Sequence, residues 1–191
     1  MRKIIASEMV TLDGYFAGPN GEIDWFVYNK EIEKYGIELA RTVDTILFGR
    51  VTYEMMASYW PSATAAINDQ IVIDQMNNSP KIVFSKTLRK AEWRNTRVIN
   101  EVNAEEISEM KKKPGKDLVI YGSGSVVSAF ANLGLIDEYH LFVNPIALGK
   151  GKPLFKDLND RQKLKLLKTR AFSNGVVLLH YQSDTEEEIE V

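Results

Sequence analysis

Apolar residues along this chain gather in short runs, and four runs have the length and character of buried strands: residues 3–10, 45–49, 81–85 and 117–122. Uninterrupted apolar runs of this length are typical of parallel strands covered on both faces. Between and beyond them, apolar residues recur at helical spacing over residues 29–42, 50–58, 103–112 and 124–133. This alternation predicts an α/β fold with a mixed but mostly parallel sheet.

The pattern changes towards the C-terminus. A longer apolar run at residues 137–146 precedes two segments near 163–172 and 176–182, which are joined by the sequence SNG. Because Asn-Gly favours a tight turn between antiparallel strands, we expect the sheet to end in an antiparallel hairpin. We expect residues 1–183 to form a single domain and residues 184–191, which are rich in carboxylates, to be a disordered tail.

Composition narrows the chemistry. The 191 residues include no cysteine and two histidines, which excludes disulfides and thiolate catalysis and makes a metal site unexpected. The net charge of −2 gives no reason to expect nucleic acid or an anionic membrane as a partner. No apolar run is long enough to span a bilayer, and the N-terminus has the pattern of a strand. We expect a cytoplasmic protein that acts on a small molecule.

The stretch LVIYGSGSVVSAF at residues 118–130 runs a buried strand through a glycine-serine loop into an amphipathic helix. Glycines let the backbone approach a ligand, and a helix N-terminus offers unpaired N–H groups to an anion such as phosphate. A tight connection in which Ser123 or Ser125 caps the helix explains the stretch equally well. A Rossmann domain is disfavoured, because the loop lacks a third glycine and lies late in the chain, and no P-loop motif occurs.

Two further strand ends carry groups that bind anions. Arg50 and Thr52 follow the strand that ends at Gly49, and Ser85 and Lys86 follow the strand beginning at residue 81. Ligands of parallel α/β sheets bind beyond the carboxyl ends of the strands, so these groups are expected to meet there. A dinucleotide would use several of them at once. In the alternative, Thr52 caps a helix and Arg50 is solvated.

Taken in order, these stretches resemble the dihydrofolate reductase-like superfamily, and within it stand-alone proteins similar to the C-terminal reductase domain of the riboflavin-biosynthesis deaminase-reductase. The matching stretches are TLDGYFAGPNGEIDW at 11–25, LFGRVTYE at 47–54, KIVFSKTL at 81–88, LVIYGSGSVV at 118–127 and GLIDEYHLFVNPIALGKGKPLF at 134–155. The resemblance implies a three-layer α/β/α fold, NADPH as cofactor and a homodimer. We expect the apolar run at 137–146, which needs cover on both faces, to supply part of the dimer surface, although helices of the same chain could cover it instead.

The resemblance also assigns roles to residues. It implies that the cofactor phosphates are held by Gly49, Arg50, Thr52, Gly122, Ser123, Gly124, Ser125 and Val126, with Ser85 and Lys86 near the adenosine ribose phosphate. Asp13 and Asp24 are the candidate catalytic residues, although Asp13 also suits a turn. Ala17 and Trp25 belong to a candidate lid over residues 14–25, although Trp25 also suits the core. His140 and His180 are expected to be structural.

The resulting hypothesis is an oxidoreductase that transfers a hydride from NADPH to a C=N or C=O group of a small heterocyclic or sugar-derived substrate. This resembles 5-amino-6-(5-phosphoribosylamino)uracil reductase. Such domains usually carry a lysine at the position of Ser7, so the chain departs from them where a phosphoribosyl substrate is concerned. The alternatives are a dihydrofolate-type reductase and a nucleotide-binding protein without turnover, since a fold does not imply a function.

Overall fold

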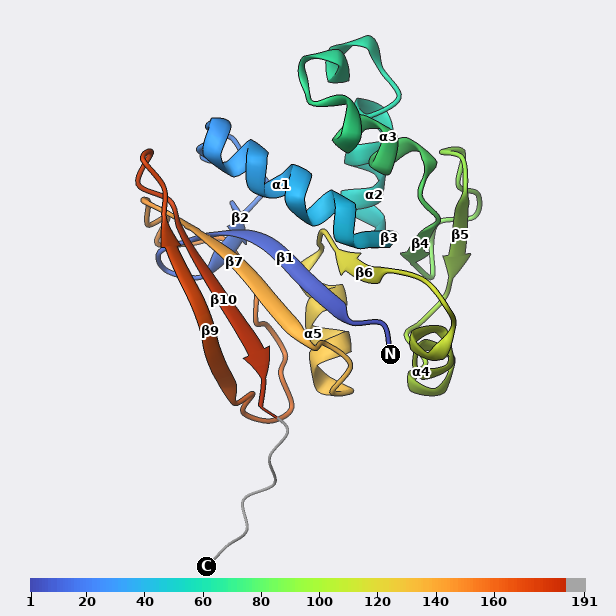
Figure 1. The fold of residues 1–191 in the computed structure, drawn as a ribbon. Coiled ribbons are helices and arrows are strands. Elements are labelled where there is room, and N and C mark those ends of the chain that lie inside the picture. The colour runs from blue at the N-terminus through green and yellow to red at the C-terminus, as the bar shows by residue number, and fades with distance from the viewer. Residues whose placement is uncertain (185–191) are drawn as a thin grey trace, which may run out of the picture.

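The computed structural model describes residues 1–184 as an eight-stranded sheet with helices on both faces (Figure 1). The strands are β1 (Ile4–Thr11), β2 (Tyr15–Ala17), β3 (Val43–Gly49), β4 (Lys81–Phe84), β5 (Thr96–Ile99), β6 (Asp117–Ile120), β7 (Glu138–Asn144), β8 (Lys152–Pro153), β9 (Leu164–Ala171) and β10 (Val177–Ser183). The helices are α1 (Lys30–Thr42), α2 (Arg50–Tyr59), α3 (Gln70–Asn78), α4 (Ala104–Lys112) and α5 (Gly124–Asn132), with a short 3-10 helix, η1, over Ala63–Ile67.

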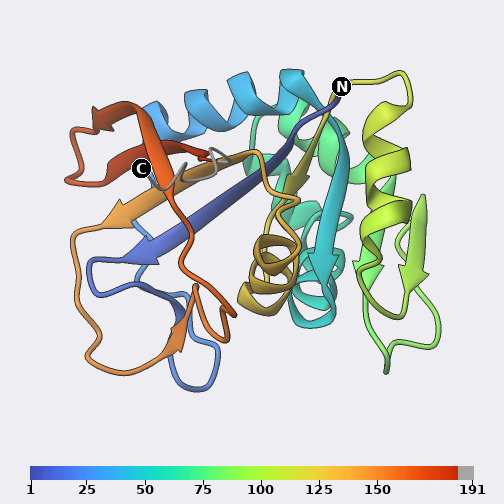
Figure 2. The same cartoon turned by 90° about the horizontal axis from the view of Figure 1, so that it is seen from below.

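The strand order is β5-β4-β3-β6-β1-β7-β10-β9, parallel from β5 to β7 and antiparallel at β10 and β9. Helices α1, α2 and α3 cover one face, and α4 and α5 cover the other (Figures 1 and 2). The three-layer α/β/α fold with a largely parallel sheet and a C-terminal antiparallel hairpin is therefore confirmed. Within the described residues no helix has both the length and the apolar character that crossing a membrane requires.

The sequence pattern missed the least periodic elements. The helix α3 carries polar residues on much of its surface and is capped by Asp69, whose side chain accepts the N–H of Ile71 at 2.8 Å. The strand β5 has four residues and forms an edge of the sheet, and β2 and β8 pair with each other outside the main sheet. The expected acidic tail lies outside the described residues except for Asp184.

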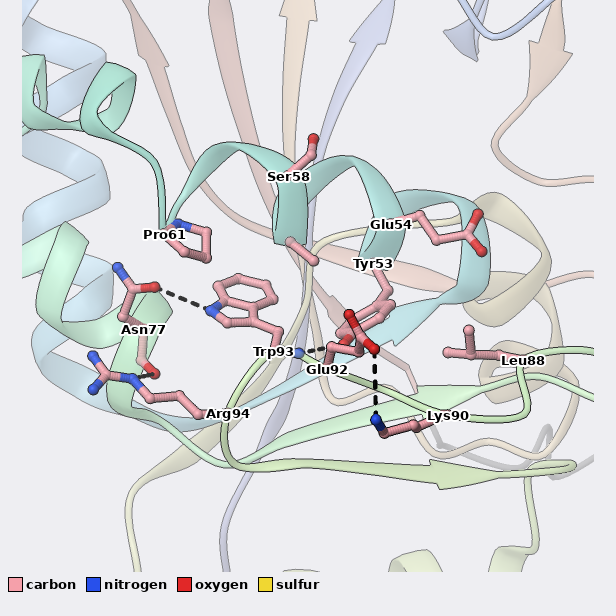
Figure 3. Close-up of a pocket in the computed structure, with 11 residues that line it drawn as sticks. Tyr53, Glu54, Ser58, Pro61, Asn77, Leu88, Lys90, Glu92, Trp93 and Arg94 are labelled. Atoms are coloured by element: carbon pink, nitrogen blue, oxygen red, sulfur yellow. Dashed lines mark hydrogen bonds and ion pairs between the residues drawn. The ribbon is translucent and has the colours of Figure 1, made fainter.

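Aromatic side chains fill the space between α2 and the sheet. The rings of Phe48, Tyr53 and Trp93 lie within 6.4 Å of one another, centre to centre. Beside them is a pocket of about 800 Å³ (Figure 3). The indole N–H of Trp93 donates to Asn77 Oδ1 at 3.0 Å, and Arg94 Nε donates to the Asn77 carbonyl at 2.9 Å. Asn77 of α3 thus holds the segment at Trp93 and Arg94, which precedes β5, against the helices of this face.

The strand β7 lies inside the sheet, between β1 and β10. Its side chains Tyr139, Leu141 and Phe142 are buried by this chain alone, against both helical layers and the C-terminal hairpin. The expectation that this apolar run forms a dimer surface is therefore wrong. Helices of the same chain cover both apolar faces of β7, which is the alternative that the sequence left open for such a strand.

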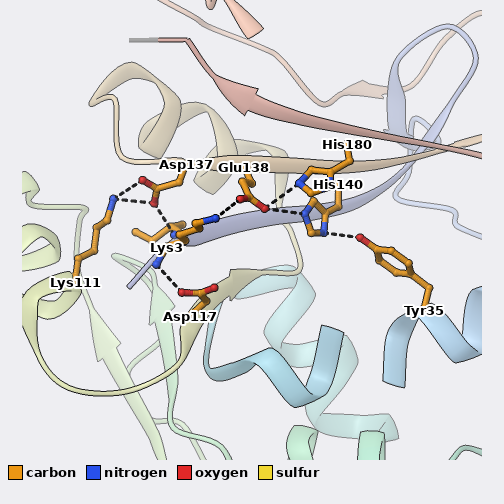
Figure 4. Close-up of polar contacts among 9 residues, drawn as sticks. Lys3, Tyr35, Lys111, Asp117, Asp137, Glu138, His140 and His180 are labelled. Atoms are coloured by element: carbon orange, nitrogen blue, oxygen red, sulfur yellow. Dashed lines mark hydrogen bonds and ion pairs between the residues drawn. The ribbon is translucent and has the colours of Figure 1, made fainter. Parts of the chain in front are cut away.

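A buried carboxylate ties β1, β7, β10 and α1 together (Figure 4). The antiparallel register places His180 opposite His140, and Glu138 lies on the same face two residues before. Glu138 accepts hydrogen bonds from Lys3 at 2.6 Å and His180 at 2.9 Å, and His140 Nε2 lies 3.3 Å away. The other ring nitrogen of His140 meets the Tyr35 hydroxyl at 2.9 Å.

This network makes both histidines parts of the packing. The ligand atoms of Glu138, His140 and His180 lie within 4.8 Å of one another, a spacing that a metal ion could use. Lys3 forms an ion pair with the Glu138 carboxylate and compensates its charge. This ion pair and the hydrogen bonds described above already account for the arrangement of the three residues. Hydrogen bonds from His140, Lys3 and His180 hold the pKa of Glu138 well below its usual range. Burial and the neighbouring His140 lower the pKa of His180.

These shifts predict loss of stability in acid. The unfolded chain binds protons on His180 and Glu138 at higher pH than the folded chain does, so the free energy of unfolding should fall as pH drops below 6.5, the ordinary pKa of His180, and fall further below 4.5, the ordinary pKa of Glu138. Glu138→Gln should lower it by about 3 kcal/mol at pH 7 and remove the part of the pH dependence that lies below 4.5. Urea titrations at several pH values measure both effects.

The matched control is Glu109→Gln, which removes an exposed carboxylate that pairs with Lys112 three residues on. Its effect should stay below about 0.5 kcal/mol, as is usual for exposed pairs on a helix. Equal pH dependence of unfolding in Glu138→Gln and the unmodified protein would contradict the assignment.

Candidate active site at the carboxyl ends of the strands

The central strand β1 extends beyond the end of its neighbour β6. Pairing of β1 with β6 stops at Ala6 and Ile120, whereas β1 continues beside β7 as far as Thr11. A cavity of about 1850 Å³ opens there and is lined by residues 7–9 of β1, the loop after β6 and parts of α1, α2, α3 and α5. The cavity thus lies at the position where parallel α/β sheets bind ligands.

The loop between β6 and α5 forms one wall of the cavity. Gly122 has a φ of 98°, a conformation that favours glycine, and its peptide bond to Ser123 is cis. Ser123 is the N-cap residue of α5 but makes no side-chain capping bond; its hydroxyl lies 2.9 Å from that of Ser125. The alternative in which Ser123 caps the helix is therefore not what the structure has. The Val126 N–H donates to the Ser123 carbonyl at 2.9 Å, so the first-turn N–H groups that an anion could use are those of Gly124 and Ser125.

A second helix begins beside this loop. Gly49 is the N-cap of α2, again without a side-chain capping bond, and its N–H donates to the Gly122 carbonyl at 3.1 Å. A Cβ at Gly49 would lie 2.3 Å from Ser123 Oγ. A Cβ at Gly124 would lie 2.5 Å from a ring carbon of Phe16. The glycines therefore allow two helix N-termini and the β2 segment to meet at one place.

The predicted cofactor residues divide into two groups. Those that line the cavity are Thr52, Gly122, Ser123, Gly124 and Ser125. Those outside its lining are Gly49, Arg50, Ser85, Lys86 and Val126.

The residues outside the lining have other surroundings. Val126 packs in the core. The Ser85 hydroxyl accepts the N–H groups of Thr87 and Leu88 at 3.1 and 2.9 Å. Arg50 and Lys86 are exposed and pair with nearby glutamates at 2.9 and 3.4 Å. Both side chains end in solvent, where long cationic side chains can change partner at little cost.

The predicted catalytic aspartates do not line the cavity. Asp13 Oδ1 accepts the Thr11 hydroxyl at 2.6 Å, and Asp13 Oδ2 accepts the Gly149 N–H at 2.7 Å. This side chain fixes the turn after β1, as the alternative assignment expected. Asp24 is exposed. Neither aspartate therefore contributes to the wall of the cavity.

Of the two candidate lid residues, one lines the cavity and the other does not. Ala17 lines the cavity, together with Gly21 from the same loop. Trp25 is buried against Phe26, and its indole N–H donates to the Glu22 carbonyl at 3.2 Å. Trp25 therefore anchors the end of the loop, whereas Ala17 faces the space that the loop borders.

One residue of the cavity lining was not identified from the sequence, the buried acid Glu8. Glu8 is 6% exposed, and its Oε1 atom has neither solvent contact nor a hydrogen-bond partner. Burial raises the pKa of this carboxyl well above its usual value, against the lowering effect of the Gly122 backbone. The available signal was an acidic residue in the middle of a strand that is otherwise apolar on the same face, with Ala6 and Val10 on either side.

The part of the cavity under α1 is apolar and aromatic. Its lining there includes Tyr35, Leu39, Met56, Tyr59 and Met76 from the three helices of that face. Methionine and aromatic side chains offer flat, adaptable contact surfaces. We call this region, together with Tyr121 and Met55, the aromatic chamber.

Fold and cavity together define the class. A solved structure of dihydrofolate reductase from Enterococcus faecalis, in complex with NADP(H), matches 95% of this chain and 96% of its own with a TM-score of 0.61 at 16% identity. The chain thus has a dihydrofolate reductase-like fold. Its family is narrower: the RibD C-terminal domain model matches residues 2–178, and the chain belongs to that family.

Relatives of similar length agree with this family. The uncharacterized protein YyaP of Bacillus subtilis is 38% identical over 180 residues, which are 94% of each chain. A solved structure described as a putative riboflavin biosynthesis protein from Shewanella sp. PV-4 matches with a TM-score of 0.75 at 23% identity, over 96% of this chain and 99% of that one. The resemblance noted from the motifs is thereby confirmed.

The glycine contacts predict what a single methyl group would do. Gly49→Ala would push against Ser123 Oγ and displace the α5 loop, so it should lower the free energy of unfolding by about 1–3 kcal/mol. Chemical denaturation measures the change. Gly36→Ala is the control: no heavy atom lies within 4 Å of its added Cβ, and in a helix it should raise stability by about 0.5–1 kcal/mol. If Gly49→Ala were as stable as the unmodified protein, the α5 loop would accommodate the methyl group without cost and the prediction would be wrong.

Proposed function

We propose that the protein is an NADPH-dependent reductase that transfers a hydride to a C=N or C=O carbon of a small heterocyclic substrate. One observation carries the proposal: a single cavity joins the N-terminal ends of α2 and α5 to an aromatic chamber. The helix N-termini suit phosphates, and the aromatic chamber suits a flat ring. Membership of a reductase-domain family supports the same assignment.

The residues present fit a dinucleotide. Glycines at 49, 122 and 124 keep the cavity wall at the α5 loop free of side chains, and a Cβ at Gly122 would lie 3.0 Å from Thr52 Oγ1. Two helix N-termini without side-chain caps adjoin that wall. A cavity of about 1850 Å³ exceeds the roughly 300–1000 Å³ typical of small-ligand pockets, as a dinucleotide with its substrate requires.

The chain's own residues then have distinct tasks. The α5 loop and Thr52 would hold the pyrophosphate, and Arg50 and Lys86 would turn towards a ribose phosphate. Bound NADPH would supply the hydride. The aromatic chamber would orient the substrate ring and exclude water from it. The loop over residues 14–25 borders the cavity through Ala17 and is positioned to cover it.

The choice of cofactor gives a direct test. Arg50→Ala and Lys86→Ala should each weaken NADPH binding by roughly tenfold to a hundredfold, about 1.5–3 kcal/mol, because one charge-assisted contact to the ribose phosphate is lost. NADH binding should change little. Calorimetric titration of both dinucleotides measures these effects.

The control is Lys112→Ala, which removes an equal charge at the end of α4, a helix that contributes no residue to the cavity lining. Equal affinity of the unmodified protein for NADPH and NADH would contradict the phosphate site. Tight NADPH binding without oxidation across a panel of carbonyl and imine compounds would favour a nucleotide-binding protein without turnover.

The family resemblance also leads us to expect a homodimer. The strand β7 cannot supply its surface, because this chain buries it, so another face would have to do so. Light scattering at micromolar concentration should give twice the mass of the 21.7 kDa chain. A monomeric mass would remove the expectation.

A further inference from the structure

The positive charges of the cavity lining gather at one end. Among the described residues the lining contains two cations, Lys152 and Lys156. The Lys152 ammonium lies 3.4 Å from a Cβ built at Gly21, in the loop whose β2 segment meets the start of α5. Lys156 precedes Asp157, whose carbonyl accepts a hydrogen bond from Asn132 of α5 at 3.0 Å. Both cations therefore lie on the α5 side, with the helix N-termini proposed to hold the cofactor phosphates.

The aromatic chamber has the opposite electrostatic character. The charged groups that line it are the acids Glu33 of α1 and Asp69, the N-cap of α3. Over the part of the chain that the structure describes, α1, α2 and α3 contribute no lysine or arginine to the lining, and Lys30 and Lys34 of α1 are exposed outside it. Tyrosine adds no charge, since burial raises the pKa of Tyr35 to about 12. An anionic group in the chamber would lose water without gaining a counter-charge.

Ser7 belongs to the floor of this chamber. Successive side chains of a strand point to opposite faces of the sheet, so Ser7 shares its face with Ile5 and Met9. Ile5 packs in the same cluster as Leu39 of α1, and Met9 packs against the cluster that contains Phe142. Ser7 therefore faces the layer of α1, α2 and α3, and it lines the cavity.

The Ser7 hydroxyl is free to contact a ligand. Ser7 lies directly opposite His140 on β7, but His140 uses one ring nitrogen with the Tyr35 hydroxyl at 2.9 Å and meets Glu138 with the other at 3.3 Å. Within the described residues no side chain or backbone group hydrogen-bonds to the Ser7 hydroxyl. Ser7 is half-buried in a central strand, so its exposed surface is reached through the cavity. A hydroxyl there can donate to or accept from a ring nitrogen or carbonyl.

The mouth of the chamber is apolar as well. Tyr28, Val51, Met55 and Ile67 line the cavity and are all exposed to solvent. Exposed apolar side chains gathered around a cavity are typical of a surface that a ligand covers. The chamber therefore offers apolar contact from its floor to its mouth and one free hydroxyl on the floor.

We propose that the substrate is a flat heterocycle without an anionic group, which stacks in the aromatic chamber, and that Ser7 is a specificity-determining residue that contacts it. The proposal rests on the proposed function, because the α5 end of the cavity is taken to hold NADPH. Specificity of this kind combines attraction with repulsion. Tyrosine and methionine surfaces hold the ring, while Glu33 and Asp69, with no cation opposite them, act against a phosphate or carboxylate.

The first test measures binding with matched probes. Pterin and pterin-6-carboxylate share one flat ring system and differ by a carboxylate attached directly to the ring. With NADP⁺ at saturation to fill the phosphate end, pterin should bind roughly tenfold more tightly at pH 6.5, where it is uncharged. Fluorescence anisotropy of the probes measures both affinities, and calorimetry establishes NADP⁺ binding beforehand. The kcat/KM values for NADPH oxidation by the two corresponding 7,8-dihydropterins should differ in the same direction.

Substitutions then test the role of charge at the chamber floor and wall. Ser7→Lys should strengthen binding of the carboxylate roughly tenfold and leave that of pterin unchanged or weaker, because the floor gains a cation. Glu33→Lys places a cation at an exposed position of the same lining and should act in the same direction, even if Ser7→Lys is unstable. Ser7→Ala should weaken pterin roughly threefold to tenfold and keep the preference.

The matched control is Ser108→Lys, which adds the same charge on α4, a helix that contributes no residue to the lining. It should change neither affinity. An unmodified protein that does not bind NADP⁺ would overturn the proposed function. With NADP⁺ bound, equal or tighter binding of the carboxylate, or no binding of pterin, would overturn the substrate class alone. A preference that neither Ser7→Lys nor Glu33→Lys shifts would overturn the specificity role of Ser7 and the chamber charges.

Discussion

The site depends on the place where two neighbouring strands stop pairing. Strand β6 pairs with the amino-terminal part of β1 and ends at Ile120, and beyond Ala6 the free edge of β1 borders a cavity. Unpaired backbone groups inside a protein are costly, so the separation needs rigid support on both sides. The long pairing of β1 with β7 supplies it on one side, and the contact between Gly49 and Gly122 supplies it on the other.

That support has a chemical consequence. Because β1 continues past the end of β6, residues 7–9 of this central strand line the cavity without a loop to carry them there. They are held by a strand that is paired along its other edge. Reactive groups on strands are placed more reproducibly than groups on loops. The aspartates at 13 and 24 lie on the turn and loop that follow, where one fixes the backbone and the other meets solvent.

Periodicity revealed most of the sheet because buried parallel strands have continuous apolar sequences. It failed for β5, which has four residues at an edge, and for α3, whose apolar face is narrow. Motifs revealed the α5 loop, because glycine spacing depends on local backbone geometry. They did not reveal Glu8 or the pairing of His140 with His180, because each depends on neighbours far away in sequence. Arg50 lies in the first turn of a helix, as the pattern predicted, but its ion pair with Glu54 was not foreseen.

The outermost strand has a consequence for how copies of the chain can meet. One edge of β9 pairs with β10, and the other ends the sheet, so its backbone could accept a further strand. Lys165, Lys168 and Arg170 lie along this eight-residue strand and would repel the same strand of another copy. Positive charge on an edge is a common defence against unwanted extension of a sheet. Self-association by adding strand to strand is therefore disfavoured, and any assembly has to use the broad faces of the molecule.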